Sequence, residues 1–390
     1  MSSLFRKVLY LSVFFMLGLL VAFFLRSPDA LREEANDSMP LSKAMKSDTT
    51  GYERATGPID FSFPADHGAH PTFKTEWWYY TGNVTGTDGR RFGFQLTFFR
   101  SALSPMVGIS DDPESDWISD QLYMAHFSMS DVENETFYAS ERFSRGSLGL
   151  AGAEGIPYRI WLDDWSAEQV SEASFFPIRL IASEGDVSLD LVVDEGKPAV
   201  YQGDRGYDQK GDDPGNASYY YSFTRLPVDG TISIGEERFV VSGQAWKDHE
   251  WSTSALGEAE VGWDWFSLQL SDGRDLMVYS LRQNDGSESR HAVGMVHDEN
   301  GTSRRLNVGE YTIETNANWT SPKSGITYPS RWTLSIPSES VELEITPRIP
   351  NQELNVTIQY WEGAVSVEGI SNGSPVTGSG FVELTGYQPN

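Results

Sequence analysis

The sequence predicts an all-β protein of short antiparallel strands, arranged as a barrel or a sandwich. In 390 residues, 36 Gly and 19 Pro are scattered singly, which indicates many turns. Hydrophobic residues make up 39% of the chain and aromatic residues 13%, which is enough for packed cores. From residue 58 onward, short alternating or aromatic runs recur between turn residues, and none of them has the apolar spacing of a helix.

The N-terminal part of the chain differs from the rest. Arg6 and Lys7 precede an uncharged apolar run over residues 8–25, which is longer than the core of a usual signal peptide. No small-x-small cleavage site follows, so we expect residues 1–26 to form a signal anchor rather than a cleaved signal peptide. The positive charges would then place the folded part on the extracytoplasmic (periplasmic) side of the membrane. Residues 27–56 are polar and indicate a disordered linker.

The remaining chain contains nine runs with the composition of strands. They cover residues 77–81, 91–99, 122–129, 179–193, 219–224, 238–246, 263–270, 275–281 and 379–384.

Two of these stretches resemble each other. Residues 77–100 and 263–282 each contain an aromatic strand, an Asp-Gly-Arg turn and a second apolar strand that ends in arginine. Because Asp-Gly favours the tight turn of a hairpin, both stretches predict the opening hairpin of a β-domain. We therefore expect two related domains, residues 57–255 and 256–390, joined near residues 252–261.

Charge and composition exclude several classes of protein. The net charge of −27 repels nucleic acid, and the absence of cysteine excludes disulfides and thiolate metal sites. The chain has no Gly-x-Ser-x-Gly elbow, phosphate-binding glycine loop or dinucleotide fingerprint. Serine hydrolases, NTPases and dehydrogenases therefore have no support, and we expect no cofactor.

The densest chemistry lies in residues 245–270. In a strand, Trp246, Asp248 and Glu250 share one face, while His249 and Trp251 share the other. In an aromatic pocket, repulsion and desolvation would separate the pKa values of the two carboxyls and leave one protonated and one ionised. Such a pair supplies an acid and a base near the predicted domain junction. The alternative is a polar network that seals the junction.

A second acidic residue of interest is Glu76, which shares a strand face with Trp78 and Tyr80. Loss of hydration there would raise its pKa and suit a proton donor. The alternative is that Glu76 bonds to the preceding loop. Neutral imidazole and carboxylate also suit zinc or iron, but His67, His70 and Glu76 match no established ligand spacing, so we expect no metal.

Aromatic side chains around these acids are the candidate substrate-binding residues. Indole faces bind flat apolar ligands and stabilise cations, although such residues also build cores. We therefore expect an apolar small-molecule ligand. The candidates are Trp78, Tyr80, Trp246, Trp251, Trp263 and Trp265.

Several motifs resemble one known family. FPADHGAHPTFKTEWWYYTGNV, FGFQLTFFR, AHFSMSD, AWKDHEWS, GWDWFSLQLSDGRDLMVYSLR and GFVELTGY, within about residues 58–388, are similar to the AttH/CrtC family. That family includes carotenoid 1,2-hydratase (hydroxyneurosporene synthase) and exported proteins called predicted secreted hydrolases. The resemblance implies two tandem lipocalin-like (calycin) antiparallel β-barrels. Glu76, Asp248, Glu250 and Trp251 fall on the shared EWWYYTG and W-x-D-x-E-W motifs, whereas His249 stands where many members have Arg.

The resemblance implies a hydratase-type enzyme, a hydro-lyase acting on an isoprenoid or lipid-like substrate. In that reaction Asp248 or Glu250 protonates an alkene, aromatic rings stabilise the cation, and the other carboxylate activates water. One alternative is a non-catalytic carrier of an apolar ligand, with an envelope transporter as a possible partner. Another is a secreted hydrolase.

Overall fold

The structure, a computed structural model, describes residues 48–105, 119–254, 256–257 and 260–387. In these residues the fold is all-β, with three short 3-10 turns, η1 (Ala65–His67), η2 (Ser147–Gly149) and η3 (Pro337–Glu339). The predicted all-β class is confirmed. The predicted signal anchor and most of the predicted linker lie outside the described residues. Within the described residues, no helix has the length and apolar character needed to cross a membrane.

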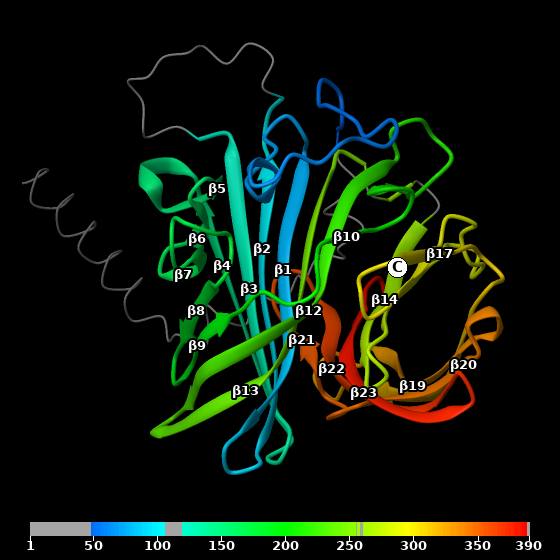
Figure 1. Cartoon of the computed structure of the whole chain (residues 1–390). Coiled ribbons are helices and arrows are strands. Elements are labelled where there is room, and N and C mark those ends of the chain that lie inside the picture. The colour runs from blue at the N-terminus through cyan, green and yellow to red at the C-terminus, as the bar shows by residue number, and fades with distance from the viewer. Residues whose placement is uncertain (1–47, 106–118, 255, 258–259, 388–390) are drawn as a thin grey trace, which may run out of the picture. The chain divides into compact units, whose positions relative to one another are not determined.

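The first sheet contains thirteen strands from the described residues (Figure 1). They are β1 (Thr75–Gly86), β2 (Arg91–Ala102), β3 (Gln121–Asp131), β4 (Thr136–Arg145), β5 (Ala151–Gly155), β6 (Tyr158–Leu162), β7 (Trp165–Gln169), β8 (Ile178–Glu184), β9 (Val187–Val193), β10 (Val200–Tyr201), β11 (Tyr207–Gln209), β12 (Ala217–Ile234) and β13 (Glu237–Ser252). Its order is β4-β3-β2-β1-β13-β12-β9-β8-β7-β6-β5, and β10 and β11 pair with β12. The sheet curls into a nearly closed barrel.

The second sheet contains ten strands and forms a half-barrel. They are β14 (Glu260–Leu270), β15 (Asp275–Gln283), β16 (Gly294–His297), β17 (Ser303–Leu306), β18 (Thr312–Thr320), β19 (Thr327–Ile336), β20 (Val341–Pro347), β21 (Glu353–Leu354), β22 (Tyr360–Ser371) and β23 (Ser374–Leu384). Its order is β17-β16-β15-β14-β23-β22-β20-β19-β18, and β21 pairs with β22.

The two sheets share a local plan. In the first, β1 pairs with β2 on one side and with β13 on the other; in the second, β14 pairs with β15 and β23 in the same way. The two similar stretches of sequence form the β1–β2 and β14–β15 hairpins, and Gly89 and Gly273 take the positive φ angles of their turns (90° and 87°). The predicted pair of hairpins is therefore confirmed. The first sheet ends at Ser252 and the second begins at Glu260.

One predicted strand is wrong. Residues 179–193 form two strands, β8 and β9, joined by a turn in which Gly185 has a φ of 56°. Both strands alternate buried positions with intermediate or exposed ones, so the run looks continuous in sequence, and only the Gly-Asp pair at 185–186 marks the turn.

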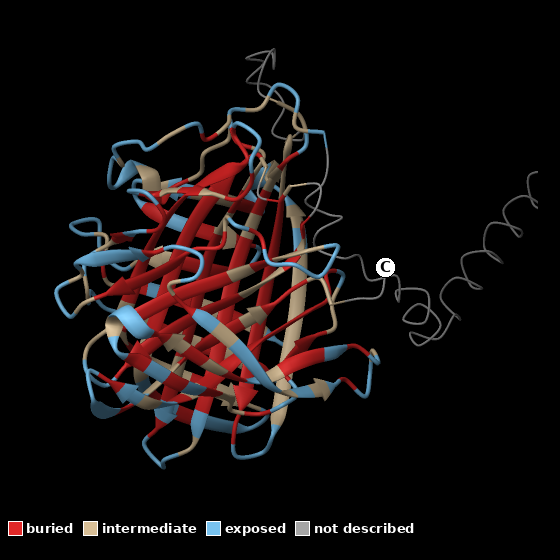
Figure 2. Ribbon diagram, turned by 90° about the vertical axis from the view of Figure 1, so that its right-hand side faces the viewer, coloured by how far each residue is buried: buried red, intermediate tan, exposed pale blue. Residues whose placement is uncertain are grey.

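Buried side chains form separate cores inside the first sheet, inside the second sheet, and between the two. Figure 2 shows that buried positions run along many of the strands, whereas exposed positions gather at the turns. The backbones approach closely at the seam between the sheets: a Cβ on Gly93 of β2 would lie 2.5 Å from the Cβ of Ala364 on β22. Asp275 on β15 is buried there and accepts bonds from Lys197 (2.7 Å) and Thr224 (2.8 Å), while Arg225 Nε donates at 3.0 Å. Apolar packing and a buried ion cluster therefore join the sheets.

Candidate functional site

A cavity of about 160 Å³ lies at the seam between the two sheets. Residues of both sheets line it, and its walls are largely apolar with several acidic groups. The aromatic rings come from Trp77, Tyr79, Phe99, Tyr220, Trp263, Trp265, Tyr279 and Tyr360. The cavity is the kind of concave, largely apolar site, with a few polar groups, that binds small molecules.

Asp248 and Glu250 both line this cavity. They lie on β13, whose alternation turns Trp246, Asp248 and Glu250 toward the seam and turns His249 and Trp251 into the first core. The predicted sharing of faces is therefore confirmed. The carboxyl pair lies beside a cavity rather than in bulk water.

Asp248 forms no ion pair with a cationic side chain among the described residues. It is 3% exposed, its Oδ1 accepts a bond from Trp246 Nε1 (2.8 Å), and it accepts a second bond from the Ser222 hydroxyl. Burial raises its pKa to about 7, although the two hydrogen bonds oppose the shift. Asp248 can therefore hold a proton near neutral pH.

Glu250 has a different environment, because a lysine lies beside it. Lys210 Nζ lies 3.2 Å from Glu250 and 2.6 Å from the buried carboxylate of Asp208. Burial raises the pKa of Glu250, but the Lys210 charge opposes the shift. The acids around Lys210 raise its own pKa despite burial, so the lysine stays charged and favours the ionised form of Glu250.

Two further acids line the cavity, and sequence reasoning missed both. Glu362 on β22 and Glu383 on β23 are directly opposite one another, and Tyr79 donates a hydrogen bond to Glu362. Burial, reinforced by mutual repulsion, raises the pKa of Glu362 well above its ordinary range, and burial raises that of Glu383 to about 7. Glu383 follows Val382 and precedes Leu384 in a predicted strand. A glutamate in a strand that is apolar on both faces is the signal that could have identified it.

Three of the predicted substrate-binding tryptophans lie at the seam. Trp263 and Trp265 line the cavity from β14, and Trp246 packs edge-on against Trp265 with ring centroids 6.3 Å apart. Trp246 helps to position Asp248, because its indole nitrogen donates a hydrogen bond to that carboxyl.

The other three aromatic candidates lie inside the first core. Trp78 stacks on His249 and donates to a backbone carbonyl, Tyr80 bonds to Tyr158, and Trp251 stacks on His70 with centroids 3.7 Å apart. None of the three is among the residues that line the cavity. All three side chains point into the first core, so they lie apart from Asp248 and Glu250.

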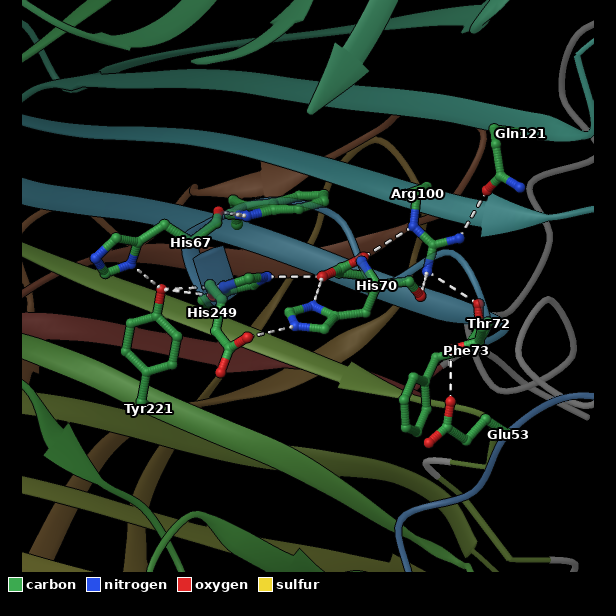
Figure 3. Close-up of polar contacts among 12 residues, drawn as sticks. Glu53, His67, His70, Thr72, Phe73, Arg100, Gln121, Tyr221 and His249 are labelled. Atoms are coloured by element: carbon green, nitrogen blue, oxygen red, sulfur yellow. Dashed lines mark hydrogen bonds and ion pairs between the residues drawn. The ribbon is translucent and has the colours of Figure 1, made fainter. Parts of the chain in front are cut away.

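Glu76 has surroundings opposite to those predicted. Its carboxylate is buried in the network of Figure 3, where it accepts bonds from Arg100 (2.8 Å), His70 (2.7 Å) and His249 (2.8 Å). Burial acts to raise its pKa, but the Arg100 charge and the two histidine bonds lower it overall. The prediction of a raised pKa is wrong, because Arg100 is directly opposite Glu76 on β2. Glu76 also lines the cavity, and its lowered pKa keeps it ionised near neutral pH; the catalytic role predicted for it stays a prediction.

The same network bears on metal binding. The ligand atoms of His70, Glu76 and His249 lie within 4.8 Å of one another, a spacing that a cation could use. Burial acts to lower the pKa of His70. However, its bonds to Asp66 and Glu76 outweigh this effect and raise the pKa to about 9. His70 is therefore protonated at neutral pH, and with Arg100 it already balances the acids.

Comparison with known proteins places this chain in a sequence family. A sequence model described as AttH-like matches residues 54–387, which is most of the chain. A crystal structure of an AttH protein from Nitrosomonas europaea is 32% identical in sequence, covers 86% of this chain and 100% of its own, and superposes with a TM-score of 0.76.

Two more distant relatives have named activities. Kievitone hydratase from Nectria haematococca shares the fold, with a TM-score of 0.66, 16% identity, and coverage of 86% of this chain and 98% of its own. The dehydratase asqC of Emericella nidulans is 23% identical over 234 residues, or 56% of this chain. The match spans 63% of that relative's length.

Proposed function

The chain belongs to the AttH-like family, and we propose that it is a hydro-lyase, an enzyme that adds water to or removes water from an apolar substrate. The observation that carries the proposal is the pair Asp248 and Glu250, which lie on one aromatic cavity in unequal surroundings. The names of two relatives, a hydratase and a dehydratase, support the same reaction type.

Asp248 is the proposed acid. It lacks a cationic partner among the described residues, and its pKa near 7 keeps it substantially protonated at neutral pH. In hydration it transfers its proton to one alkene carbon and leaves a carbocation on the other. The faces of Trp263, Trp265 and the cavity tyrosines would stabilise that cation through their negative π-surfaces.

Glu250 is the proposed base. Lys210 favours its ionised form, so it can take a proton from the water that attacks the carbocation. Dehydration runs the same steps in reverse: protonated Glu250 donates to the leaving hydroxyl, water departs, and ionised Asp248 takes a proton from the carbon next to the cation, which forms the alkene. One constellation therefore serves both directions, and it needs no cofactor.

The size of the cavity limits the substrate. Its volume of about 160 Å³ is similar to the engineered apolar cavity of about 150 Å³ that binds benzene. We infer that it holds one aromatic ring or a unit of isoprenoid size, which can be the reacting end of a longer molecule. A complete long polyene does not fit inside.

A direct test is incubation with a panel of apolar isoprenoid and phenolic alkenes and the corresponding alcohols, followed by mass spectrometry for gain or loss of one water. We expect Asp248→Asn and Glu250→Gln to lose turnover while remaining folded. The control Glu353→Gln changes a buried carboxyl in the second sheet that is not among the residues lining the cavity. Full turnover by the folded Asp248→Asn variant would refute the assignment.

A carrier is the second candidate, because an aromatic cavity of this kind also suits passive binding. It predicts that an apolar molecule co-purifies with the protein and is recovered chemically unchanged. Native mass spectrometry of protein purified from its own host separates the two functions, since an enzyme would convert the recovered molecule on incubation.

The finer statements of fold and location are also proposals. We propose that the two sheets are lipocalin-like barrels, which is consistent with their repeated local order. We further propose export of the folded part, as the apolar run at residues 8–25 predicts. Fractionation of cells that produce the full chain tests export.

A further inference from the structure

A row of polar side chains runs from the surface of the first sheet to the cavity. Its outer end is His126 on β3 and Glu141 on β4, which are directly opposite one another. His126 Nε2 and Glu141 Oε2 lie 4.0 Å apart, and neither atom has a hydrogen-bond partner among the described residues. Buried polar atoms normally have partners, so two that face each other need an explanation.

Glu141 is fixed in this orientation. Its Oε1 accepts bonds from the backbone nitrogen (2.7 Å) and the hydroxyl (2.8 Å) of Thr357, which leaves Oε2 for His126. The Glu141 side chain is 21% exposed, whereas that of His126 is 1% exposed. Glu141 can therefore exchange protons with solvent, and His126 cannot do so directly.

The next contact crosses from the first sheet to the second. His126 Nδ1 lies 2.7 Å from the hydroxyl oxygen of Tyr360 on β22, and Gln95 donates a bond to the same oxygen at 3.1 Å. Burial lowers the pKa of His126 to about 3, so its ring is neutral and can donate through Nδ1. The Tyr360 hydroxyl then keeps its own hydrogen for Glu362, which lies two residues along the same strand face and also lines the cavity, and whose Oε2 has no hydrogen-bond partner among the described residues.

The inner end of the row reaches the proposed acid. Tyr79 donates a hydrogen bond to Glu362, and Tyr79 is directly opposite Asp248 in the β1–β13 register. Glu362 and Asp248 both line the cavity, so the last transfer takes place across it.

We propose that this row is a proton relay that recharges the acid of the cavity, an inference that rests on the proposed function for its purpose. Its members, in order from the surface, are Glu141, His126, Tyr360 and Glu362.

The proposed reaction creates the need for such a relay. Each hydration leaves Asp248 ionised, because its proton goes to carbon, and leaves Glu250 protonated, because it takes a proton from water. The next turnover requires one proton delivered to Asp248 and one released from Glu250. Water is added overall, no proton is consumed, and no oxidant or reductant takes part.

The relay supplies the delivered proton in four transfers. Protonated Glu362 passes its proton to Asp248, and the Tyr360 hydroxyl releases its hydrogen to Glu362. Nδ1 of His126 passes its proton to the Tyr360 oxygen, while Nε2 takes one from Glu141, which is reprotonated from solvent. Each residue gains one proton and loses one, and the row returns to its starting state once the imidazole re-forms its original tautomer.

The test needs no substrate, so its result is independent of the proposed reaction. Infrared spectroscopy detects the C=O stretch of a buried protonated carboxyl, and the band that disappears in Glu362→Gln belongs to Glu362. On rapid transfer from H₂O to D₂O, this band shifts as the carboxyl exchanges its hydrogen. The rate of the shift measures proton access to Glu362.

We expect Tyr360→Phe, which keeps the ring and removes only the hydroxyl, to slow the exchange roughly tenfold or more, as loss of a positioned proton-transfer group does. His126→Ala should slow it similarly, and added imidazole should restore the rate, which a merely structural role does not predict. The matched control His297→Ala removes another buried histidine, bonded to Ser303, and should leave the rate unchanged.

Three results would overturn the relay: no band lost in Glu362→Gln, wild-type exchange in Tyr360→Phe, or a slow His126→Ala variant that imidazole does not rescue. Glu141→Gln, a change at a partly exposed position, covers the case in which a buried variant fails to fold. If exchange follows the prediction but no water is added to any substrate, the relay stands and the proposed reaction fails.

Discussion

Asp248 and Glu250 are two residues apart on one strand, yet their neighbours make them chemically different. Asp248 has an indole and a hydroxyl as partners, whereas Glu250 has Lys210. Strand alternation made the pair visible in sequence, but the partner of each carboxyl was not, because Lys210 approaches from another part of the chain. For the same reason the raised pKa predicted for Glu76 was wrong, since nothing local to Glu76 indicates Arg100.

The raised pKa of Asp248 predicts how stability depends on pH. Burial moves this pKa from 3.8 to about 7, so between these values the folded state holds the proton more tightly than the unfolded state. The free energy of unfolding of the wild type therefore falls as pH rises through this window. Asp248→Asn cannot ionise, so its stability relative to the wild type should increase from pH 4 to pH 8, by up to about 4 kcal/mol. Urea denaturation across this range measures the difference. If the free energies of unfolding of the wild type and of Asp248→Asn depended on pH in the same way, the raised pKa of Asp248 would be contradicted.

Glu76 provides a second prediction at this scale. Glu76→Gln leaves Arg100 buried without its counter-charge and should lower the free energy of unfolding by about 3–5 kcal/mol. Glu237→Gln is the control, because Glu237 also pairs with an arginine, Arg90, but is 68% exposed. That variant should lose less than about 1 kcal/mol. If both variants lost the same free energy of unfolding in urea denaturation, burial of the Glu76–Arg100 pair would make no difference to its contribution to stability.

At the scale of elements, the sequence predicts strands well and pairing poorly. Asp-Gly turns and aromatic runs located the β1–β2 and β14–β15 hairpins, because turn chemistry is local. The turn between β8 and β9 was missed, and Glu362 and Glu383 were not recognised as a pair. They become neighbours because β22 and β23 form a hairpin around Asn372-Gly373, a local turn signal that the sequence analysis did not use. Two of the five acids that line the cavity were therefore missed, whereas Glu76, Asp248 and Glu250 were among the predicted site residues.

Contact between β2 and β22 can be tested by exchanging two small residues. Gly93→Ala places a Cβ 2.5 Å from that of Ala364, so it should destabilise the protein by about 1–3 kcal/mol. Adding Ala364→Gly removes the clashing atom and should recover most of the loss. Thermal unfolding of the two single variants and the double variant measures the coupling. Additive losses in the double variant would mean that the strands are not in contact at this point.

At the scale of the whole described fold, the cavity exists only because the two sheets are joined, and Asp275 is a central link between them. Asp275→Ala leaves Lys197 and Arg225 without their buried counter-charge and should cost about 3–5 kcal/mol in urea denaturation. The control Asp285→Ala lies in an exposed turn and should have little effect. A loss below about 1 kcal/mol for Asp275→Ala would show that the sheets are held together by apolar packing alone.

The most direct test of the central claim follows the oxygen of water into the product. Protein incubated with an apolar alkene substrate in ¹⁸O-labelled water should yield an alcohol that carries the label, and the folded Asp248→Asn and Glu250→Gln variants should yield none. Labelled product formed at the wild-type rate by either variant would contradict a hydro-lyase that uses these two carboxyls.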